Sequence, residues 1–348
     1  MIYGFGIGTV NKNGKIIESF FPNPGISGQS DEAVGSELVD QLKLTEGTTH
    51  IPTKDELDRI IVKTAQNVNL NSVFWEIDKL KQFNWTLPNK QLFFFLKRND
   101  SPPESVEEAY LKLHLLSHRK VKPHQINLDG VFKVLVNIAW TNYGPIDLQE
   151  VEEFRLNRAI EGTHFEVNCV DKFPKMTDYV IPSEVRIADT ARVRLGAYIG
   201  KGTTVMHEGF VNFNAGTEGP NMVEGRISAG VMVREGSDLG GGCSTMGTLS
   251  GGGNVIISVG KHCLIGANGG IGIPLGDNCV IESGLYVTSG TVVTILDNEK
   301  KVAGKVKARE LSNKDNLLFR RNSTNGVIEC LTSKNTVELN SDLHLFNA

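Results

Sequence analysis

Aliphatic side chains recur at every sixth position through much of the second half of the chain. They stand at Ile181, Ile187, Val193, Ile199, Val205 and Val211, then at Ile227, Val233 and Leu239, then at Val259, Ile265 and Ile271, and last at Leu275, Ile281, Val287 and Val293. A period of six matches neither the 3.6-residue period of a helix nor the alternation of an ordinary strand. It is typical of a three-sided parallel coil, in which each face is a short strand, each corner favours Gly or Asn, and every sixth side chain points inward. The pattern predicts a mainly β protein built around a parallel β-helix of hexapeptide repeats.

The regular spacing is interrupted three times, at roughly residues 212–226, 240–258 and 272–274. The first two interruptions contain the segments NFNAG and GGGCS. A repeating coil can absorb extra residues only as loops or distorted corners. We therefore expect the functional residues at these interruptions.

The parts of the chain that flank the repeats have other patterns. Residues 2–10 and 15–21 are strand-like on either side of the pair Asn13-Gly14, while residues 53–67, 104–118 and 147–160 have helical periodicity. We divide the chain into an N-terminal α/β domain (1–100), a helical connecting region (101–178), the β-helix (179–296) and a C-terminal β segment (297–348). The flanking parts are expected to cap the coil, whose ends would otherwise expose unpaired strand edges.

Composition and charge exclude several classes of partner. The 348 residues include 37 glycines but only 12 prolines, which indicates many tight turns rather than disorder. A formal charge of −4, with both signs interspersed, is unlike that of a nucleic-acid-binding protein. No stretch has the apolar length of a membrane span, and residues 1–10 are interpreted as a strand rather than a signal peptide. We expect a cytoplasmic protein that binds neither nucleic acid nor membrane.

The five cysteines form no metal or disulfide motif. They are widely spaced, at Cys169, Cys243, Cys263, Cys279 and Cys330, with no Cys-x-x-Cys pair. We expect small buried side chains in a reducing compartment rather than a catalytic thiol.

Four segments carry a resemblance to a known family. They are TVMHEGFVNFN (204–214), MVEGRIS (222–228), MGTLSGGG (246–253) and LLFRRNS (317–323). The chain resembles the longer-chain tetrahydrodipicolinate N-succinyltransferases from about residue 110 to its C-terminus. The resemblance implies a left-handed β-helix and a homotrimer with active sites between neighbouring subunits. It also implies transfer of the succinyl group of succinyl-CoA to tetrahydrodipicolinate, a small dicarboxylate, in diaminopimelate and lysine biosynthesis.

Glu224 is the candidate catalytic residue. On an extended strand, Glu224 and Arg226 would project from the same face, which suits a base beside a carboxylate-binding guanidinium. The resemblance implies that Glu224 is catalytic, either as a general base or as an acyl-anhydride nucleophile, and that Arg226 contacts ligand. We favour the base, because carboxylate attack on a thioester would create a mixed anhydride that water destroys. His207 is the alternative base, since histidine titrates near neutral pH.

The remaining candidate residues concern binding. The glycines of residues 240–242 offer backbone amides without obstruction by a Cβ atom, and cationic side chains near the C-terminus suit the phosphates of coenzyme A. The resemblance extends the binding set to Gly241, Ser244, Ala267, Glu282, Ser283, Gly290, Lys307, Arg320, Arg321, Asn322 and Ser323. It also implies Mg²⁺ near the trimer axis at Glu208, although Ala191 stands where some relatives have a second acidic ligand.

Three other functions compete with this one. Another acyltransferase could use a different acyl-CoA or amine acceptor on the same scaffold. A metal-dependent hydrolyase with this coil needs three zinc-binding histidines, but only His207 and His262 lie in the repeats. A purely structural coil would have no catalytic residue at all.

Overall fold

The computed structural model describes residues 1–26, 47–66, 77–247 and 255–332. The chain divides into two compact units. Unit 1 comprises Met1–Val121, Gln125–Pro174 and Asp178–Val180, and unit 2 comprises Lys122–His124, Lys175–Thr177 and the chain from Ile181 onward. The described residues are mainly β, as the sequence predicts.

Unit 1 is built on an antiparallel sheet. Its strands are β1 (Ile2–Val10), β2 (Ile16–Phe20), β3 (Gly25–Ile26), β4 (Thr49–His50) and β5 (Lys90–Lys97), in the order β2-β1-β5-β4 with β3 also paired to β1. The hairpin of β1 and β2 turns at Asn13-Gly14, which confirms the predicted turn.

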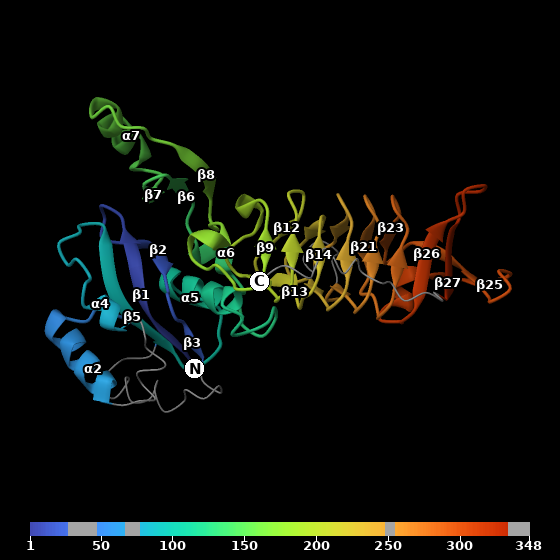
Figure 1. Ribbon diagram of the computed structural model, residues 1–348, viewed down its shortest axis with the longest axis horizontal. Coiled ribbons are helices and arrows are strands. Elements are labelled where there is room, and N and C mark those ends of the chain that lie inside the picture. The colour runs from blue at the N-terminus through green and yellow to red at the C-terminus, as the bar shows by residue number, and fades with distance from the viewer. Residues whose placement is uncertain (27–46, 67–76, 248–254, 333–348) are drawn as a thin grey trace. The chain divides into compact units, whose positions relative to one another are not determined.

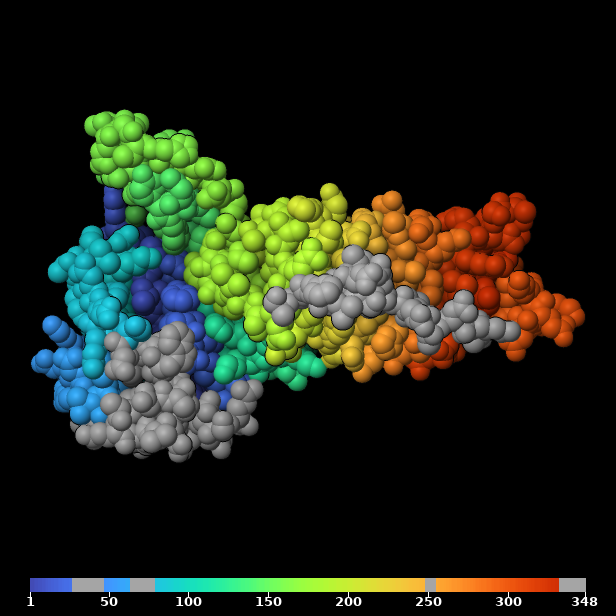
Figure 2. Space-filling view, in the orientation of Figure 1, coloured from blue at the N-terminus to red at the C-terminus, as the bar shows by residue number. Residues whose placement is uncertain are grey.

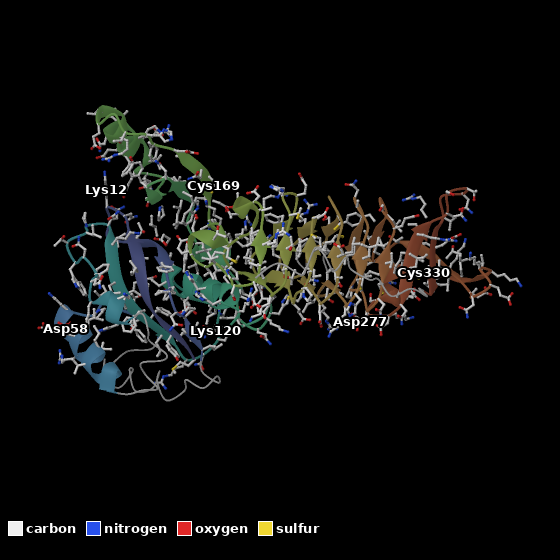
Figure 3. All side chains as sticks on the ribbon, in the orientation of Figure 1. Lys12, Asp58, Lys120, Cys169, Asp277 and Cys330 are labelled. Atoms are coloured by element: carbon white, nitrogen blue, oxygen red, sulfur yellow. The ribbon has the colours of Figure 1, made fainter. Side chains whose placement is uncertain are left out.

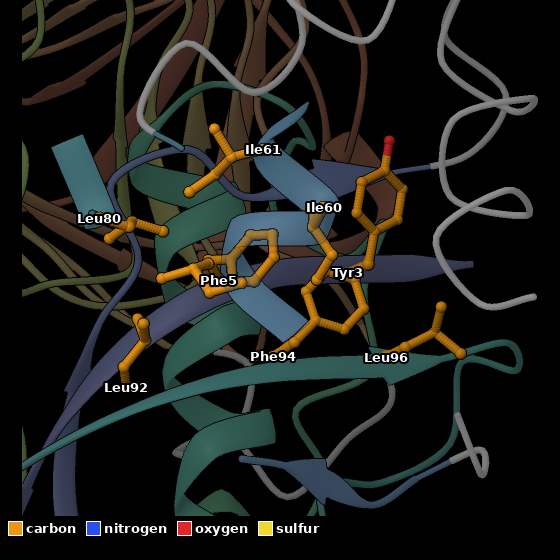
Figure 4. Close-up of a cluster of buried hydrophobic side chains, with 9 residues drawn as sticks. Tyr3, Phe5, Ile60, Ile61, Leu80, Leu92, Phe94 and Leu96 are labelled. Atoms are coloured by element: carbon orange, nitrogen blue, oxygen red, sulfur yellow. The ribbon is translucent and has the colours of Figure 1, made fainter. Parts of the chain in front are cut away.

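Helices cover this sheet. Helix α2 (Lys54–Gln66) and helix α4 (Ile77–Leu80) contribute Leu57, Ile60, Ile61 and Leu80 to a buried cluster with Tyr3, Phe5, Leu92, Phe94 and Leu96 of β1 and β5 (Figure 4). Helix α5 (Val106–Ser117) contacts β1, β2 and β5 and is capped by the Ser105 side chain. These helices confirm two of the predicted helical segments, 53–67 and 104–118.

The third predicted helix packs on a second, smaller sheet of unit 1. Helix α7 (Val151–Ile160) packs with the sheet β7-β6-β8, whose strands are β6 (Ile138–Thr141), β7 (Gly144–Asp147) and β8 (Val167–Asp171). A short helix, α6 (Val131–Val134), precedes this sheet. The helix was expected, whereas the three short strands were not, because they carry no repeated pattern.

Unit 2 is a coil with three faces, each a parallel sheet. Face 1 contains β9 (Arg186–Ile187), β11 (Thr204–Val205), β14 (Met222–Val223), β17 (Asp238–Leu239), β20 (Leu264–Ile265) and β22 (Val280–Ile281). Face 2 contains β12 (Phe210–Val211), β15 (Arg226–Ile227), β18 (Ser244–Thr245), β21 (Gly270–Gly272) and β23 (Tyr286–Thr288). Face 3 contains β10 (Ala197–Ile199), β13 (Ala215–Thr217), β16 (Met232–Val233) and β19 (Ser258–Val259). The chain visits the three faces in turn and advances by one rung at each return, as Figure 1 shows for β12 to β23.

The predicted inward row is confirmed over most of its length. The side chains from Val193 to Val293 in that row are fully buried or nearly so, and each stacks on its counterpart one coil away. The first two positions are exceptions, because 80% of the surface of Ile181 is exposed and Ile187 is only half-buried. Ile181 precedes the first strand of the coil, so the regular repeat begins with β9 rather than at Ile181.

The interruptions are narrower than the sequence suggested. Thr217 and Thr245 occupy inward positions and are fully buried, so the six-residue spacing continues through both of them. Their hydroxyls are satisfied inside the coil, by Thr203 in the first case and by the Arg226 carbonyl in the second. An aliphatic pattern cannot detect a polar inward residue, and this explains the error. The first interruption is only a corner shortened to Glu224-Gly225, between β14 and β15.

The C-terminal end of the coil is covered by antiparallel strands. Strand β24 (Val292–Leu296) pairs with β25 (Val302–Lys307) across a turn at 297–300, within the predicted C-terminal β segment. Strand β26 (Leu317–Arg321) adds to face 1 next to β22, and β27 (Ile328–Thr332) pairs antiparallel with β26. In Figure 2 the colour of unit 2 changes from yellow-green to red along the coil, and the C-terminal strands are orange to red. The expected cap is therefore present at this end.

All five cysteines are free thiols, and four of them are buried. Cys330 lies within the C-terminal strands, whereas Cys169 is exposed on β8, so the expectation of burial is wrong for Cys169 (Figure 3). Among the described helices, none has the length and apolar character needed to cross a bilayer.

Replacement of Ile265 by Ala tests the stacking of the inward row. Ile265 is fully buried and its strand pairs with β17 and β22 on either side. We expect the free energy of unfolding to fall by about 2–5 kcal/mol in urea denaturation. Val302→Ala is the control, since Val302 is 66% exposed and should cost less than about 0.5 kcal/mol. Equal stability of the two variants would contradict the stacked core.

Candidate functional site

Most of the predicted ligand residues lie on one edge of the coil, where the chain passes from face 1 to face 2. We call it the 1–2 edge. Its five corners are residues 206–209, 224–225, 240–243, 266–269 and 282–285. They contain Glu208, Glu224, Gly241, Ala267, Glu282 and Ser283, and the end of β26 continues the row with Arg320, Arg321, Asn322 and Ser323. Since adjacent rungs are about 4.8 Å apart, the row from Glu224 to Asn322 is roughly 19 Å long.

Glu224 occupies the shortest corner of this edge. The other four corners have four residues between strands, whereas only Glu224 and Gly225 connect β14 to β15. Two residues cannot extend as far from the coil as four, and Glu224 is accordingly half-buried while Ala267, Glu282 and Ser283 are exposed. The shortened corner therefore holds the Glu224 side chain at a recessed point of the edge.

The next corner leaves room for the Glu224 carboxylate. A Cβ atom placed on Gly241 would lie 3.5 Å from Glu224 Oε2, so the carboxylate extends over the backbone of Gly241. The Gly242 N–H donates to the Glu224 carbonyl at 3.3 Å, and the Glu224 N–H donates to the Leu239 carbonyl at 2.8 Å. Both backbone groups of Glu224 are thus bonded to the neighbouring coil, which fixes the origin of its side chain.

The prediction that Glu224 and Arg226 project from one strand is wrong. Glu224 lies in the corner of the 1–2 edge, whereas Arg226 begins β15 on face 2, and the two side chains form no ion pair within 4.0 Å. The Arg226 guanidinium instead donates to Ser244 Oγ through Nε at 3.2 Å and through Nη2 at 3.0 Å. The structure thus brings together Arg226 and Ser244, two predicted ligand residues from adjacent rungs.

Backbone N–H groups along the 1–2 edge are available to a ligand. Within the described residues, no acceptor is found for the N–H groups of Gly241, Ala267 and Ser283, which occupy equivalent positions on successive coils. Polar backbone groups that lack a partner in the protein bond to water or ligand. The edge therefore offers a row of donors that suits an extended chain carrying carbonyl groups.

The sequence reasoning missed Asp238. It stands on β17, directly opposite Met222 of β14 and Leu264 of β20. Burial, together with the nearby Glu224 carboxylate, raises the pKa of Asp238 to about 6. Stacking the hexads would have revealed it as a carboxylate among the outward residues Thr204, Met222, Leu264 and Val280.

Cys243 also lies beside Glu224 but is a poor nucleophile. Burial, reinforced by the carboxylates of Asp238 and Glu224, raises the pKa of its thiol to about 12. A thiol that stays protonated is inert, which agrees with the sequence interpretation.

Some predicted cofactor residues hold the C-terminal strands together. Arg320 is paired with Glu329, at 3.0 Å from Nε and 2.9 Å from Nη2 to the same oxygen, and Asn322 Nδ2 donates to the other oxygen at 2.7 Å. The Arg321 N–H donates to Glu282 Oε2 at 2.6 Å. Arg321 and Ser323 are exposed at the edge. Among the predicted cations, Arg321 is therefore better disposed toward a phosphate than Arg320.

Gly290 and Lys307 are not on the 1–2 edge. Gly290 follows β23, and Lys307 pairs with Val292 at the start of β24, so the two lie close together at the next corner of the coil. The predicted binding residues of one chain thus form two groups.

The predicted magnesium position has one candidate carboxylate in this chain, that of Glu208. Glu208 and His207 are exposed on the corner 206–209, and Ala191 is exposed in a short 3₁₀ turn. In the part of the chain that the structure describes, no three His, Cys, Asp or Glu side chains gather around a possible metal position. A single carboxylate does not meet the demand of Mg²⁺ for octahedral oxygen ligands.

Comparison with known proteins agrees with this arrangement. A family model described as the hexapeptide repeat of succinyl-transferase matches residues 256–289. Together with the three-faced coil, this match defines a transferase of the hexapeptide-repeat class. Models for the N-terminal and middle parts of tetrahydrodipicolinate N-succinyltransferase match residues 60–133 and 135–175. The chain belongs to the tetrahydrodipicolinate N-succinyltransferase family.

Individual relatives cover the whole chain. The 2,3,4,5-tetrahydropyridine-2,6-dicarboxylate N-succinyltransferase of Pseudomonas putida is 53% identical over 346 residues, which cover 99% of this chain and 97% of the relative. The enzyme of the same name from Vibrio cholerae is 53% identical over 351 residues, covering 99% and 98%. A Campylobacter jejuni crystal structure, provisionally described as a 2,3,4,5-tetrahydropyridine-2-carboxylate N-succinyltransferase, has a TM-score of 0.82 at 32% identity and covers 97% of this chain and 93% of that one.

The environment of Asp238 predicts a pH-dependent stability. An acid whose pKa is raised on folding stabilises the native state at low pH, and this contribution is lost as the pH rises through about 6. We expect wild type to lose about 2 kcal/mol more than Asp238→Asn between pH 4.5 and pH 8, since each pKa unit corresponds to about 1.4 kcal/mol and solvent reduces the total.

Urea unfolding at the two pH values measures this difference. Glu299→Gln is the control, because the Glu299 side chain is 72% exposed and should leave the pH dependence unchanged. Identical pH profiles for wild type and Asp238→Asn would show that the carboxylate is not desolvated.

Proposed function

We propose that the chain transfers the succinyl group of succinyl-CoA to tetrahydrodipicolinate, giving N-succinyl-2-amino-6-oxopimelate and coenzyme A. The observation that carries this proposal is the recessed Glu224 carboxylate, which extends over Gly241 beside a backbone N–H without a partner in the described chain. An acyl transfer to nitrogen needs a base for the amine and a donor for the developing oxyanion. The full-length relatives that bear this name support the choice of substrates.

Glu224 acts as the general base in this proposal. The attacking nitrogen must lose a proton as it bonds to the thioester carbon. The half-buried Glu224 carboxylate, on a residue whose backbone is hydrogen-bonded to the next coil, can accept that proton. The proton then passes to the departing thiolate of coenzyme A. The exposed His207 on the neighbouring corner is the alternative base. Glu224 is preferred because its side chain lies against the Gly241 amide.

The N–H of Gly241 stabilises the oxyanion, and Arg226 binds a substrate carboxylate. The N–H groups of Ala267 and Ser283 receive carbonyl oxygens of the pantetheine arm, which extends along the 1–2 edge toward Arg321, Asn322 and Ser323. Arg321 and Lys307 are the cations proposed for the phosphates. Residues 179–296 would thus carry the acyl-transfer site and residues 297–348 would complete the cofactor site.

The coil is proposed to be left-handed and the protein a homotrimer. The two separate groups of predicted binding residues support the trimer, since Gly290 and Lys307 of one chain could complete the 1–2 edge of the next. Mg²⁺ at Glu208 would require carboxylates from neighbouring copies of the chain, because one copy supplies too few ligands. The free thiols support a reducing, cytoplasmic location.

An enzymatic assay tests the proposed function. The purified chain should release coenzyme A thiol from succinyl-CoA when tetrahydrodipicolinate or its slower analogue 2-aminopimelate is present. Acetyl-CoA in the same assay separates this activity from that of another acyltransferase. If no thiol appears with either acceptor, the proposal fails.

Glu224→Gln tests the base. The amide keeps the size of the side chain but cannot accept the proton, so kcat should fall by about 10²–10⁴. Succinyl-CoA binding, measured by calorimetry, should change little because the backbone donors remain. A rate within a few fold of wild type would transfer the role of base to His207, and His207→Gln provides the matched comparison.

Arg226→Lys tests carboxylate binding. Lysine keeps the charge but loses the planar fork and the contacts with Ser244. We expect the KM for 2-aminopimelate to rise about 10-fold, with a smaller effect on the KM for succinyl-CoA. An unchanged KM for both substrates would count against a direct role for Arg226.

A further inference from the structure

The outward side chains of face 2 form one continuous row beside the 1–2 edge. In register, Phe210 of β12 pairs with Arg226 of β15, Arg226 with Ser244 of β18, Ser244 with Gly270 of β21, and Gly270 with Tyr286 of β23. Gly270 alone in this row has no side chain. The space above Gly270, between Ser244 and Tyr286, is therefore available to a side chain from a neighbouring rung.

Tyr286 covers that open rung. A Cβ atom on Gly270 would lie 2.2 Å from Cε2 and 2.6 Å from Cζ of Tyr286, so the ring lies flat on the backbone of β21. The ring thus extends from its own rung over the rung of Gly270, which is the neighbour of Ser244 in the row. The residue is still 41% exposed. Glycine is required at position 270, since any side chain there would displace the ring.

Arg226 approaches Ser244 from the opposite side. Its Nε and Nη2 both donate to Ser244 Oγ, and these two bonds occupy the two acceptor lone pairs of that hydroxyl. The Ser244 O–H can then serve only as a donor. The other N–H groups of the Arg226 guanidinium also remain available.

Three donors therefore lie along one row of neighbouring rungs without an acceptor from the protein. Across the described part of the chain, no hydrogen bond is found from the Ser244 hydroxyl or the Tyr286 hydroxyl, and no carboxylate lies within 4.0 Å of the Arg226 guanidinium. Ser244 is only 8% exposed, so its donor is largely removed from bulk water. A buried donor without a partner is costly, and an anionic ligand with planar geometry would satisfy all three groups.

We propose that Tyr286 is a ligand-binding residue of this site, and that its hydroxyl, the Ser244 hydroxyl and the Arg226 guanidinium together bind one carboxylate of a substrate. The inference rests on the proposed function, in which both substrates carry a carboxylate. The group that binds here is either a carboxylate of the acceptor or the distal carboxylate of the succinyl chain. The aromatic ring supplies an apolar surface beside the methylene carbons that both ligands carry.

Calorimetry on the full chain tests the inference without relying on turnover. The probes are pimelate, a seven-carbon dicarboxylate that represents the acceptor, and succinyl-CoA compared with acetyl-CoA, which lacks the distal carboxylate. In Tyr286→Phe we expect a loss of about 10-fold in affinity for the probe whose carboxylate binds here, since a hydrogen bond to a charged group is removed. Weaker pimelate binding identifies the acceptor, and loss of the preference for succinyl-CoA over acetyl-CoA identifies the acyl donor.

Two further variants control this experiment. Tyr198→Phe makes the same change on β10 of face 3 and should leave all affinities within 2-fold. Gly270→Ala should weaken the same probe as Tyr286→Phe by displacing the ring, but it should add little in the Tyr286→Phe background, where the hydroxyl is already absent.

The outcomes separate the inference from the proposed function. If wild type binds the probes and Tyr286→Phe binds them within 2-fold of wild type, the inference is wrong and the proposed function stands. If wild type binds neither pimelate nor succinyl-CoA, both are overturned.

Discussion

The candidate site depends on the stacking of inward side chains in the coil. Each buried aliphatic side chain rests on the corresponding one of the previous coil, as Leu239, Ile265 and Ile281 do on face 1. This stacking sets the register of all three faces, because a slip of one residue would turn the buried row outward. Residues at equivalent positions on successive coils must then lie one rung apart. Functional groups that are far apart in the sequence, such as Glu224 and Ser283, are aligned on one edge by this constraint alone.

A small departure from the repeat creates the recess that holds Glu224, the proposed base. Had the corner after β14 contained four residues like its neighbours, Glu224 would lie at the level of Ala267 and Glu282, exposed to solvent. The loss of two residues draws the corner inward against Cys243 of the next coil. Cys243 leaves no room for a side chain at position 225, which is glycine. The coil tolerates this change because the inward row resumes at Ile227. The repeat therefore makes the coil rigid, and its interruption positions the proposed base.

Glycine has a second use on face 2. At Gly270 the absence of a side chain allows a tyrosine from the next rung to lie across the sheet toward Ser244 and Arg226. At Gly241 the effect is smaller, because a Cβ atom there would lie 3.5 Å from Glu224 Oε2, an ordinary contact distance. The missing Cβ atom of Gly270 therefore determines where the side chain of Tyr286 on the adjacent coil can lie.

The sequence by itself determined the coil, the three longer helices of unit 1 and the hairpin at Asn13-Gly14, because these follow from local periodicity and turn chemistry. It also singled out Glu224, although as one of a pair with Arg226 on a single strand. Only the tertiary structure placed Glu224 in a corner and Arg226 on face 2, joined Arg226 to Ser244, paired Arg320 with Glu329 and brought Asp238 next to Glu224. The physical reason is that these contacts join residues of different coils or strands. Their distance depends on the number of residues in every intervening corner, and polar inward residues such as Thr217 and Thr245 conceal that number from an aliphatic pattern.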